Sequence, residues 1–184
     1  MSAVKSGTIS ETRVDEAVQR VLHLKRGIAP VPGDIDRAAH CQLAQQIASR
    51  ALRLERTVPS LQGQTLALFA PKIVQGAIEE SSLLTLGAQT LSVFFEGLNP
   101  SEQEAALMQE MAQQADRVIF CSYNAWKNTA QADLIRSLLK QKSVIAIVLG
   151  DPLDTALFSG ADCTLTTFSP TAPSLQAACT LLKP

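Results

Sequence analysis

Short apolar runs alternate with amphipathic segments over the last two thirds of the chain. The runs have the length of buried strands and read TLALFA (65–70), LSVFF (91–95), RVIFCS (117–122), SVIAIVLG (143–150) and CTLTTF (163–168). The segments between them repeat apolar residues at helical spacing, most clearly at 101–115, 128–142 and 174–183. Strands that alternate with helices form mainly parallel sheets covered on both faces. The pattern therefore predicts an α/β fold, a three-layer α/β/α sandwich of flavodoxin-like type with about five to six strands.

Two further helices are predicted before the first buried strand. Ser10 is a typical N-cap, and Gly27 a typical end, for a helix over residues 10–26. The apolar face of this helix holds Val14, Ala17, Val18, Val21 and Leu22. The next helix begins near residue 36, and its predicted apolar face holds Leu43, Ala44, Ile47, Ala48 and Ala51. The segment ALRLERTV (51–58) then alternates at period two, which is typical of a half-exposed edge strand.

Local signals set the expected boundaries. The Pro- and Gly-rich stretch IAPVPGDID (28–36) separates the first helix from the rest of the chain. We therefore expect a helical region at 1–29, a linker at 30–36 and the α/β sandwich at 37–184. Two helices of the sandwich begin with the spacing of a capping box, Ser101 with Glu104 and Asn128 with Gln131.

Composition and charge exclude several classes of protein. Sixteen basic and seventeen acidic residues nearly cancel, which gives no field for binding nucleic acid. The apolar runs are too short for a membrane span, and the first residues lack the apolar core of a signal peptide. The four cysteines are scattered without a CxxC motif, so we expect free, mostly buried thiols, no metal site and, slightly, a cytoplasmic location. Dinucleotide, P-loop and nucleophile-elbow motifs are missing from the sequence, and no cofactor is expected.

Polar residues gather where the predicted parallel strands end. In a doubly wound sheet, ligands and partners meet the carboxyl ends of the strands. Lys72, Glu96, Tyr123, Asn124, Asp151 and Asp154 are expected to converge at that edge. Trp126 joins this set because the stretch CSYNAWKN (121–128) carries the only tyrosine and the only tryptophan of the chain. Two interpretations stay open, ordinary polar turns at strand ends or a site for a small polar ligand.

Asp151 and Asp154 also have two interpretations. Two carboxylates facing each other across a bond are the apparatus of a glycosidase. Three residues apart after a strand, however, Asp151 more often caps the following turn, with Pro152 at the first helical position. We expect capping.

Several segments together resemble one enzyme family. SGTISETRVDEAVQRVLHLKRG (6–27) is similar to the segment that leaves the catalytic barrel of glycoside hydrolase family 3 enzymes, and DIDRAAHCQLAQQIASRALRLER (34–56) to the opening of their second domain. The run from residue 116 to residue 158, with its YNA turn, resembles the β-N-acetylglucosaminidase branch, as does LTTFSPTAPSLQAACTLL (165–182). The resemblance is loose from 57 to 96, and Trp126 and Phe168 depart from the family pattern.

The resemblance implies a C-terminal domain that packs against a (β/α)₈ barrel and shapes a rim of the site for an N-acetylglucosamine-containing sugar. In that family the nucleophile, an Asp, lies on the barrel, and in this branch so does the proton donor, a His. No residue of this chain is therefore expected to be catalytic. We expect the sequence from Met1 onward to be part of a longer protein, in which the helix at 10–26 connects the barrel to this domain. The alternative is an autonomous flavodoxin-like module that binds a sugar or another small polar ligand at Tyr123 and Asn124.

Overall fold

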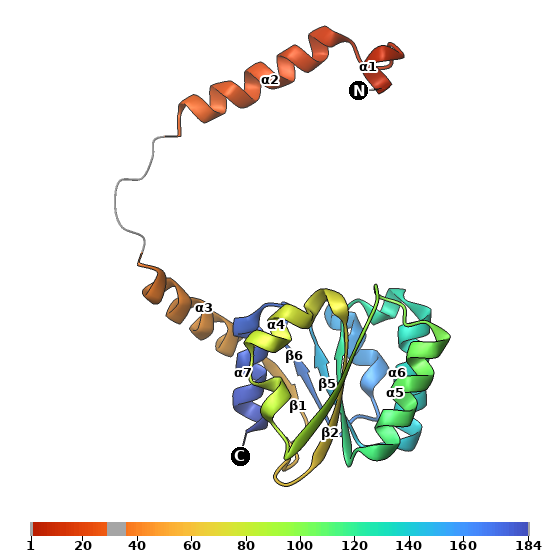
Figure 1. The fold of residues 1–184 in the computed structure, drawn as a ribbon. Helices are drawn as coiled ribbons and strands as arrows, with labels where there is room; N and C mark the ends of the chain where they lie inside the picture. Colours follow the sequence, from red (N-terminus) through yellow and green to blue (C-terminus); the bar gives the residue numbers. More distant parts are fainter. Residues whose placement is uncertain (1, 29–35, 184) are drawn as a thin grey trace. The chain divides into compact units, whose positions relative to one another are not determined.

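The chain folds into two compact units, residues 1–37 and 38–184. The computed structural model describes residues 2–28 and 36–183, drawn in colour in Figure 1. Most of the predicted linker at 30–36 lies outside these residues. Each unit is described by itself below.

The first unit consists of two helices, α1 (Ser2–Lys5) and α2 (Glu11–Arg26). As predicted, the Ser10 side chain caps α2 by accepting a hydrogen bond from the Arg13 N–H, and Gly27 ends the helix. The predicted apolar face forms but stays exposed, with Val14, Val18, Val21 and Leu22 at 40%, 48%, 50% and 42% exposure. An amphipathic helix normally buries such a stripe against another element. Nothing within residues 2–28 provides that cover.

The second unit is built on a six-stranded sheet with the order β1-β6-β5-β4-β2-β3. Five strands are parallel, and the short β1 pairs antiparallel with β6 at one edge. The strands are β1 (Arg53–Glu55), β2 (Thr65–Pro71), β3 (Gln89–Phe95), β4 (Arg117–Ser122), β5 (Val144–Val148) and β6 (Cys163–Thr166). Without β1, the order is that of flavodoxin-like sheets, in which the chain winds first to one side and then to the other. The predicted fold class is confirmed.

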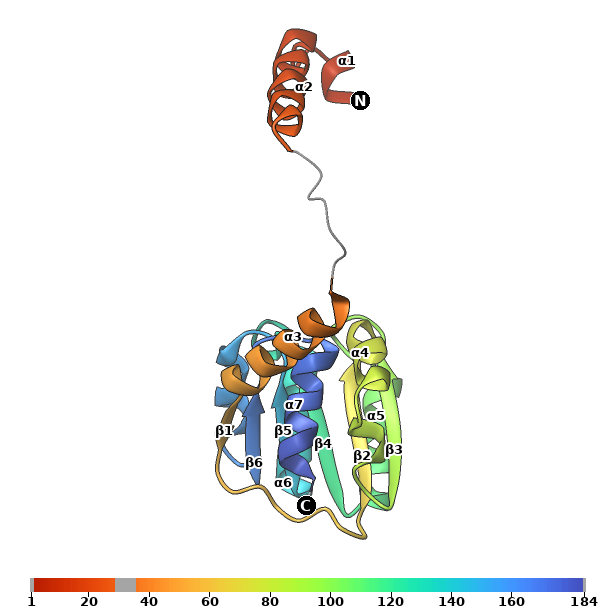
Figure 2. The same cartoon turned by 90° about the vertical axis from the view of Figure 1, so that its left-hand side faces the viewer.

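Helices cover both faces of the sheet. Figure 1 shows α5 and α6 on one side and α4 and α7 on the other, while Figure 2 shows α3, α4 and α7 in front of the sheet. The helices are α3 (Arg37–Ala51), α4 (Gln75–Glu80), α5 (Glu102–Gln114), α6 (Thr129–Gln141) and α7 (Ala172–Leu182). Short 3₁₀ helices follow three of the strands, η1 (Lys72–Val74) after β2, η3 (Ala125–Lys127) after β4 and η4 (Pro152–Phe158) after β5. A fourth, η2 (Leu83–Thr85), lies between α4 and β3.

Two apolar clusters, one on each face of the sheet, form the core. Successive residues of a strand point to opposite faces, so Leu68 belongs to the cluster under α4 and α7, and Phe69 to the cluster under α5 and α6. The central strands β4 and β5 divide in the same way, which explains their continuous apolar runs. The four cysteines are free, and three of them are buried, as predicted, while Cys41 is exposed.

Two predicted apolar faces are more exposed than expected. LSVFF was predicted as a buried strand, but β3 pairs only with β2 at the edge of the sheet, and only Phe95 is buried. On α3, only Ala48 is buried, whereas Leu43 and Ile47 are 54% and 59% exposed. The place of β3 and α3 in the fold determines how exposed they are, and apolar spacing along the sequence does not encode that place.

One of the two predicted capping boxes is present. Ser101 and Glu104 make both reciprocal hydrogen bonds at the start of α5. The prediction for Asn128 and Gln131 is wrong, because Asn128 precedes α6 without capping it by its side chain. Gln131 is instead buried, and its amide bonds to backbone groups outside the helix. Helix spacing alone did not distinguish a capping glutamine from a buried one.

The Glu104 carboxylate makes stability depend on pH. It accepts hydrogen bonds from the Glu96 N–H, the Ser101 N–H and the Ser101 hydroxyl, and these bonds lower the pKa of Glu104, that from Glu96 most. A carboxyl whose pKa is lower in the folded than in the unfolded state stabilises the fold above its unfolded pKa. That contribution is lost as the pH falls through the folded pKa.

We expect Glu104→Gln to lower the free energy of unfolding at pH 7 by about 0.5–1 kcal/mol. The difference from the parent protein should shrink as the pH falls below about 4.3, the usual pKa of a glutamate. Urea denaturation at a series of pH values measures it. Glu110→Gln, an exposed change on the same helix, is the control and should show no such dependence.

Candidate functional site

The predicted site residues all lie at the carboxyl edge of the sheet. Ser122 pairs with Val148 and Val148 with Thr166, so β4, β5 and β6 end at the same level. The strand order reverses between β2 and β4, which is where doubly wound sheets place their ligands. Lys72 and Tyr123 directly follow these two strands.

A buried carboxylate holds the loop after β4. Asp154, on η4, is fully buried and accepts hydrogen bonds from the Ala125 N–H at 3.0 Å and the Trp126 N–H at 2.9 Å. Asn124 enters this turn in the left-handed conformation, with φ 54°. Asparagine tolerates that conformation better than most residues. The backbone of the predicted YNA turn is therefore fixed from a neighbouring loop.

Gln131 also fixes this loop, and the sequence analysis missed that role. Its side-chain oxygen accepts a hydrogen bond from the Tyr123 N–H at 3.2 Å, and its NH₂ group donates to the Leu98 carbonyl at 2.7 Å. The Asn128 NH₂ group donates to the Asn124 carbonyl at 2.7 Å. Gln131 precedes Leu134, Ile135 and Leu138 on the buried face of α6. The sequence did carry a signal for this role, because Gln131 is a polar residue at a helical position that faces the core.

Asp151 links Trp126 to the loop after β5. One carboxylate oxygen accepts a hydrogen bond from the Trp126 indole N–H at 3.1 Å, and the other accepts from the Leu153 N–H at 3.0 Å. Asp151 thus caps η4 with Pro152 at the first position, as predicted. Asp151 and Asp154 both bind N–H groups of the chain and do not form an open pair of carboxylates.

The remaining predicted residues lie in two places along this edge. Lys72 and Glu96 form an ion pair between the ends of β2 and β3, and its hydrogen bond raises the pKa of Lys72. Tyr123 is half-buried beside Gly150, where a Cβ atom would come within 3.3 Å of the tyrosine ring. Among the described residues, no hydrogen bond or ion pair joins the Lys72–Glu96 pair to the group around Trp126.

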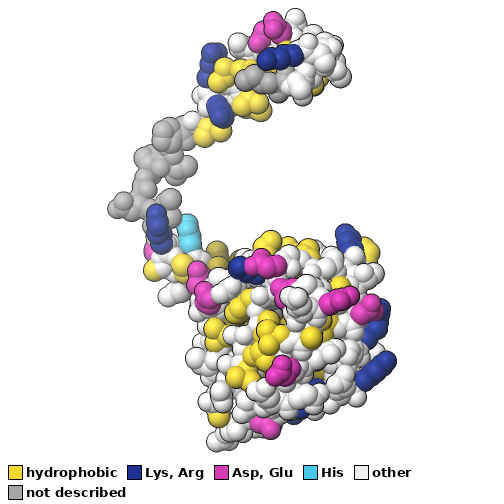
Figure 3. Space-filling model, turned by 45° about the vertical axis from the view of Figure 1, so that its right-hand side comes forward, with side chains coloured by type: hydrophobic (Ala, Val, Ile, Leu, Met, Phe, Trp, Pro, Cys, Tyr) yellow, Lys and Arg dark blue, Asp and Glu magenta, His cyan; other side chains and the backbone are white. Residues whose placement is uncertain are grey.

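Four large apolar side chains are exposed at this edge, beside the charged Lys72, Glu96 and Lys127. Ile73, Trp126, Leu153 and Phe168 are 72%, 42%, 56% and 39% exposed, and each follows a different strand. We call these four residues the carboxyl-edge ridge. In Figure 3, yellow hydrophobic side chains gather on the visible face of the sheet-containing unit, its upper rim included. Since the nearby polar groups bond within the chain, the edge suits packing better than binding a polar ligand.

Phe168 holds its exposed position in an unfavourable backbone conformation. Its φ is 57°, in the left-handed region, which costs a bulky residue about 1–2 kcal/mol. Thr167 anchors the turn, because its N–H and hydroxyl both donate to the Val148 carbonyl, at 2.9 and 3.1 Å. The Arg53 guanidinium lies over the ring, 5.3 Å from its centre.

Neither a metal site nor a membrane-spanning helix is found among the described residues. No group of three or more His, Cys, Asp or Glu side chains there is arranged to hold a metal ion. None of the described helices combines the length and apolar character needed to cross a bilayer.

Comparison with known proteins finds relatives by structure only. No protein-family model matches the chain, and no curated protein matches its sequence. A solved family 3 β-N-acetylglucosaminidase from Paenibacillus sp. superimposes with a TM-score of 0.67 and 22% identity, over 98% of this chain and 39% of that one. A fungal multi-domain β-N-acetylglucosaminidase of the same family gives 0.66 and 21%, over 98% of this chain and 23% of that one. The chain shares its fold with part of family 3 glycoside hydrolases.

The comparison confirms the family resemblance at the level of fold and leaves the branch unresolved. A β-glucosidase from Listeria innocua matches almost as well, with a TM-score of 0.66 and 18% identity over 98% of this chain and 32% of that one. The chain therefore spans well under half the length of each of these three proteins.

We expect Asp154→Ala to lower the free energy of unfolding by about 3 kcal/mol, because two N–H groups lose a charged acceptor. Urea denaturation followed by far-UV circular dichroism measures the loss. Asp133→Ala removes an exposed carboxylate from α6 and should change stability by at most about 0.5 kcal/mol. Equal effects of the two substitutions would contradict the role given to Asp154.

We expect Phe168→Asn to change the free energy of unfolding by less than about 1 kcal/mol, since relief of backbone strain offsets the lost ring contacts. The comparison variant is Phe158→Ala, at a fully buried ring, which should cost about 3–5 kcal/mol. Thermal and urea denaturation provide both values. A loss above about 2 kcal/mol for Phe168→Asn would show that ring packing outweighs the backbone strain.

Proposed function

We propose that this chain is a non-catalytic C-terminal domain of a family 3 glycoside hydrolase of the β-N-acetylglucosaminidase type, and that it packs against a catalytic (β/α)₈ barrel. The observation that carries the proposal is the unequal coverage of the structural match. Nearly all of this chain, 98%, superimposes on only 39% of the Paenibacillus enzyme. Such a match is expected of one domain of a larger protein.

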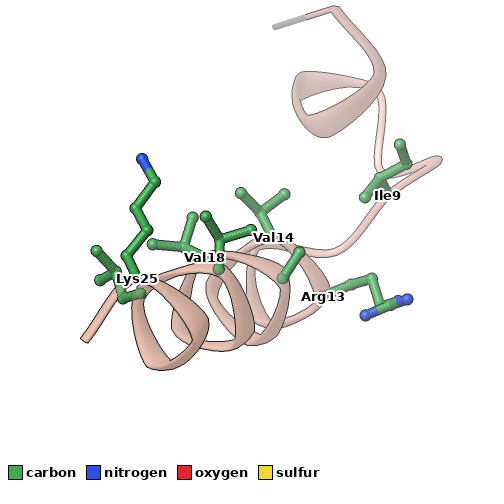
Figure 4. A pocket seen from close by; sticks show the side chains of 8 residues that line it. Ile9, Arg13, Val14, Val18 and Lys25 are labelled. Carbon is green, nitrogen blue, oxygen red and sulfur yellow. The ribbon is translucent and has the colours of Figure 1, made fainter. Parts of the chain in front are cut away.

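The exposed stripe of α2 supports this proposal. The stripe and its neighbours line an open groove of about 620 Å³, whose residues are Ile9, Arg13, Val14, Ala17, Val18, Val21, Leu22 and Lys25. Figure 4 shows Val14 and Val18 projecting from the same side of α2. An apolar groove on a single helix is expected where another domain supplies the missing layer. In the proposed protein, α2 is the hand-over helix, and the barrel covers this groove.

The arrangement of carboxylates supports a non-catalytic role. A retaining glycosidase holds two carboxyl groups about 5 Å apart on either side of the sugar. At the carboxyl edge, Asp151 and Asp154 instead hold backbone and indole N–H groups, and Glu96 is paired with Lys72. The edge is therefore proposed to shape a rim of the sugar site while the barrel supplies the reacting groups.

We expect the purified chain to release no nitrophenol from 4-nitrophenyl N-acetyl-β-D-glucosaminide, because the carboxylates described at its carboxyl edge are bonded within the chain and form no open pair. A complete family 3 enzyme serves as the positive control in the same assay. Turnover that co-elutes with the chain through size exclusion and ion exchange would contradict the proposal. Sequencing upstream of Met1 tests it independently, since a barrel-encoding frame is expected there.

An autonomous binding module is the second candidate, and the position of Tyr123 and Asn124 beside the switch point of the sheet favours it. Trp126, the sole tryptophan, reports on this place directly. A saturable change of its fluorescence with N-acetylglucosamine below about millimolar concentration, a free energy of binding beyond about −4 kcal/mol, would favour the module. The internal hydrogen bonds of the loop favour the domain role instead.

A further inference from the structure

The edge strand β3 lacks the features that usually keep an edge strand from pairing with another chain. Those features are a short length, a charged side chain, a proline or a bulge. β3 spans seven residues, Gln89–Phe95, and none of them is charged or a proline. Its register with β2 runs without interruption along all seven, so the strand has no bulge. Figure 2 shows β3 as the outermost strand, and no strand of the described residues pairs with its other side.

The opposite edge of the sheet is protected in the usual way. β1 is only three residues long and carries Arg53 and Glu55, so a strand that joined it would find a short ladder bordered by charge. Each copy of the sheet therefore offers one long edge only. When two such edges pair with each other, both are used and no third copy can add, which closes the assembly as a two-fold dimer.

We infer that two copies of this chain pair through β3, antiparallel about a two-fold axis at Ser92, and join their sheets into one. The backbone N–H and C=O groups on the outer side of β3 then bond to protein instead of water. The second copy suits this place because it brings a strand of equal length without charge. The inference is separate from the proposed function, since neither a barrel nor a sugar takes part in the pairing.

The sequence of β3 complements itself about Ser92. With the axis there, Ser92 lies opposite Ser92 of the second copy, and all seven residues of the strand find a partner. Leu91 lies opposite Val93, and this apolar pair occurs twice because of the symmetry. Thr90 lies opposite Phe94, also twice. Residues directly opposite each other interact on the same face, and like charges there would be destabilising. No charged residue occurs in this ladder.

Apolar side chains of α5 continue the surface beside β3. Val93 and Met111 pack against the same core cluster, the one under α5 and α6. Leu107 lies one helical turn before Met111 and is 46% exposed. A two-fold axis perpendicular to the sheet keeps α5 of both copies on the same face. The ladder therefore has an apolar layer beside it, which two paired strands need for stability in water.

Sedimentation velocity of the whole chain tests the inference. We expect a reversible monomer–dimer equilibrium between about 5 and 500 µM chain, because an interface of this size is usually weak. Ser92→Lys should weaken dimerisation at least tenfold, since it sets two ammonium groups opposite each other. Leu54→Lys on β1 and Val18→Lys on α2 add the same charge at other exposed positions. Both should leave the dimer unchanged.

A mixture of two charge variants tests the position of the axis. Ser92→Glu alone should be as monomeric as Ser92→Lys, and an equimolar mixture of the two should dimerise again. Circular dichroism checks that each variant is folded. A parent chain that stays monomeric up to about 500 µM would overturn the inference, because even weak specific interfaces associate there. A dimer that Val18→Lys or Leu54→Lys disperses while Ser92→Lys does not would overturn it too.

Disulfide cross-linking tests the register without a change of charge. Cys41, the exposed cysteine, is first replaced by serine. Ser92→Cys then places two thiols on Cα atoms about 4.5–5.5 Å apart across the axis, within the range that a disulfide spans. Gln89→Cys, at an equally exposed site, leaves its two copies about 20 Å apart. Oxidation with diamide should cross-link Ser92→Cys and not Gln89→Cys. Equal cross-linking of both variants, or of neither, would overturn the antiparallel pairing.

Discussion

The buried carboxylate of Asp154 is the constraint on which the carboxyl edge of this fold depends. It joins two loops that the sheet alone does not connect, since η3 follows β4 and η4 follows β5. A buried charge without partners costs several kcal/mol, so the two N–H groups and the carboxylate require one another. Once they are joined, the left-handed Asn124 and the outward position of Trp126 follow from the path of the chain.

This arrangement determines which atoms reach the surface. Gln131, Asn128 and Asp151 all direct their polar groups at the chain itself, so the loop after β4 is satisfied from within. What remains outside is ring and aliphatic surface together with the Lys72–Glu96 ion pair and Lys127. The same residue types with open hydrogen-bonding groups would form a polar ligand site. Their internal use is why this edge suits packing better than the binding of a polar ligand by this domain alone.

The sequence was sufficient for the fold, because burial on both faces of a parallel sheet leaves a continuous apolar signal in each central strand. Helix caps were also predicted correctly where both partners are close in sequence, as with Ser10, Ser101 and Asp151. Contacts between segments far apart in the sequence could not be predicted from it. Gln131 looked like a cap because its partners, Tyr123 and Leu98, lie outside its own helix. The edge position of β3 was hidden for the same reason, since strand order is not a local property.

The two edges of the sheet differ in how they meet other molecules. β1 is only three residues long and carries Arg53 and Glu55, and short charged edge strands resist pairing with further strands. β3 is seven residues long, has no charge and no proline, and leaves one side of its backbone without a neighbouring strand. Uncharged segments of this kind are where aggregation begins when chains are concentrated or partly unfolded. Pairing of this sheet with a further strand is therefore expected at β3, at the margin opposite β1.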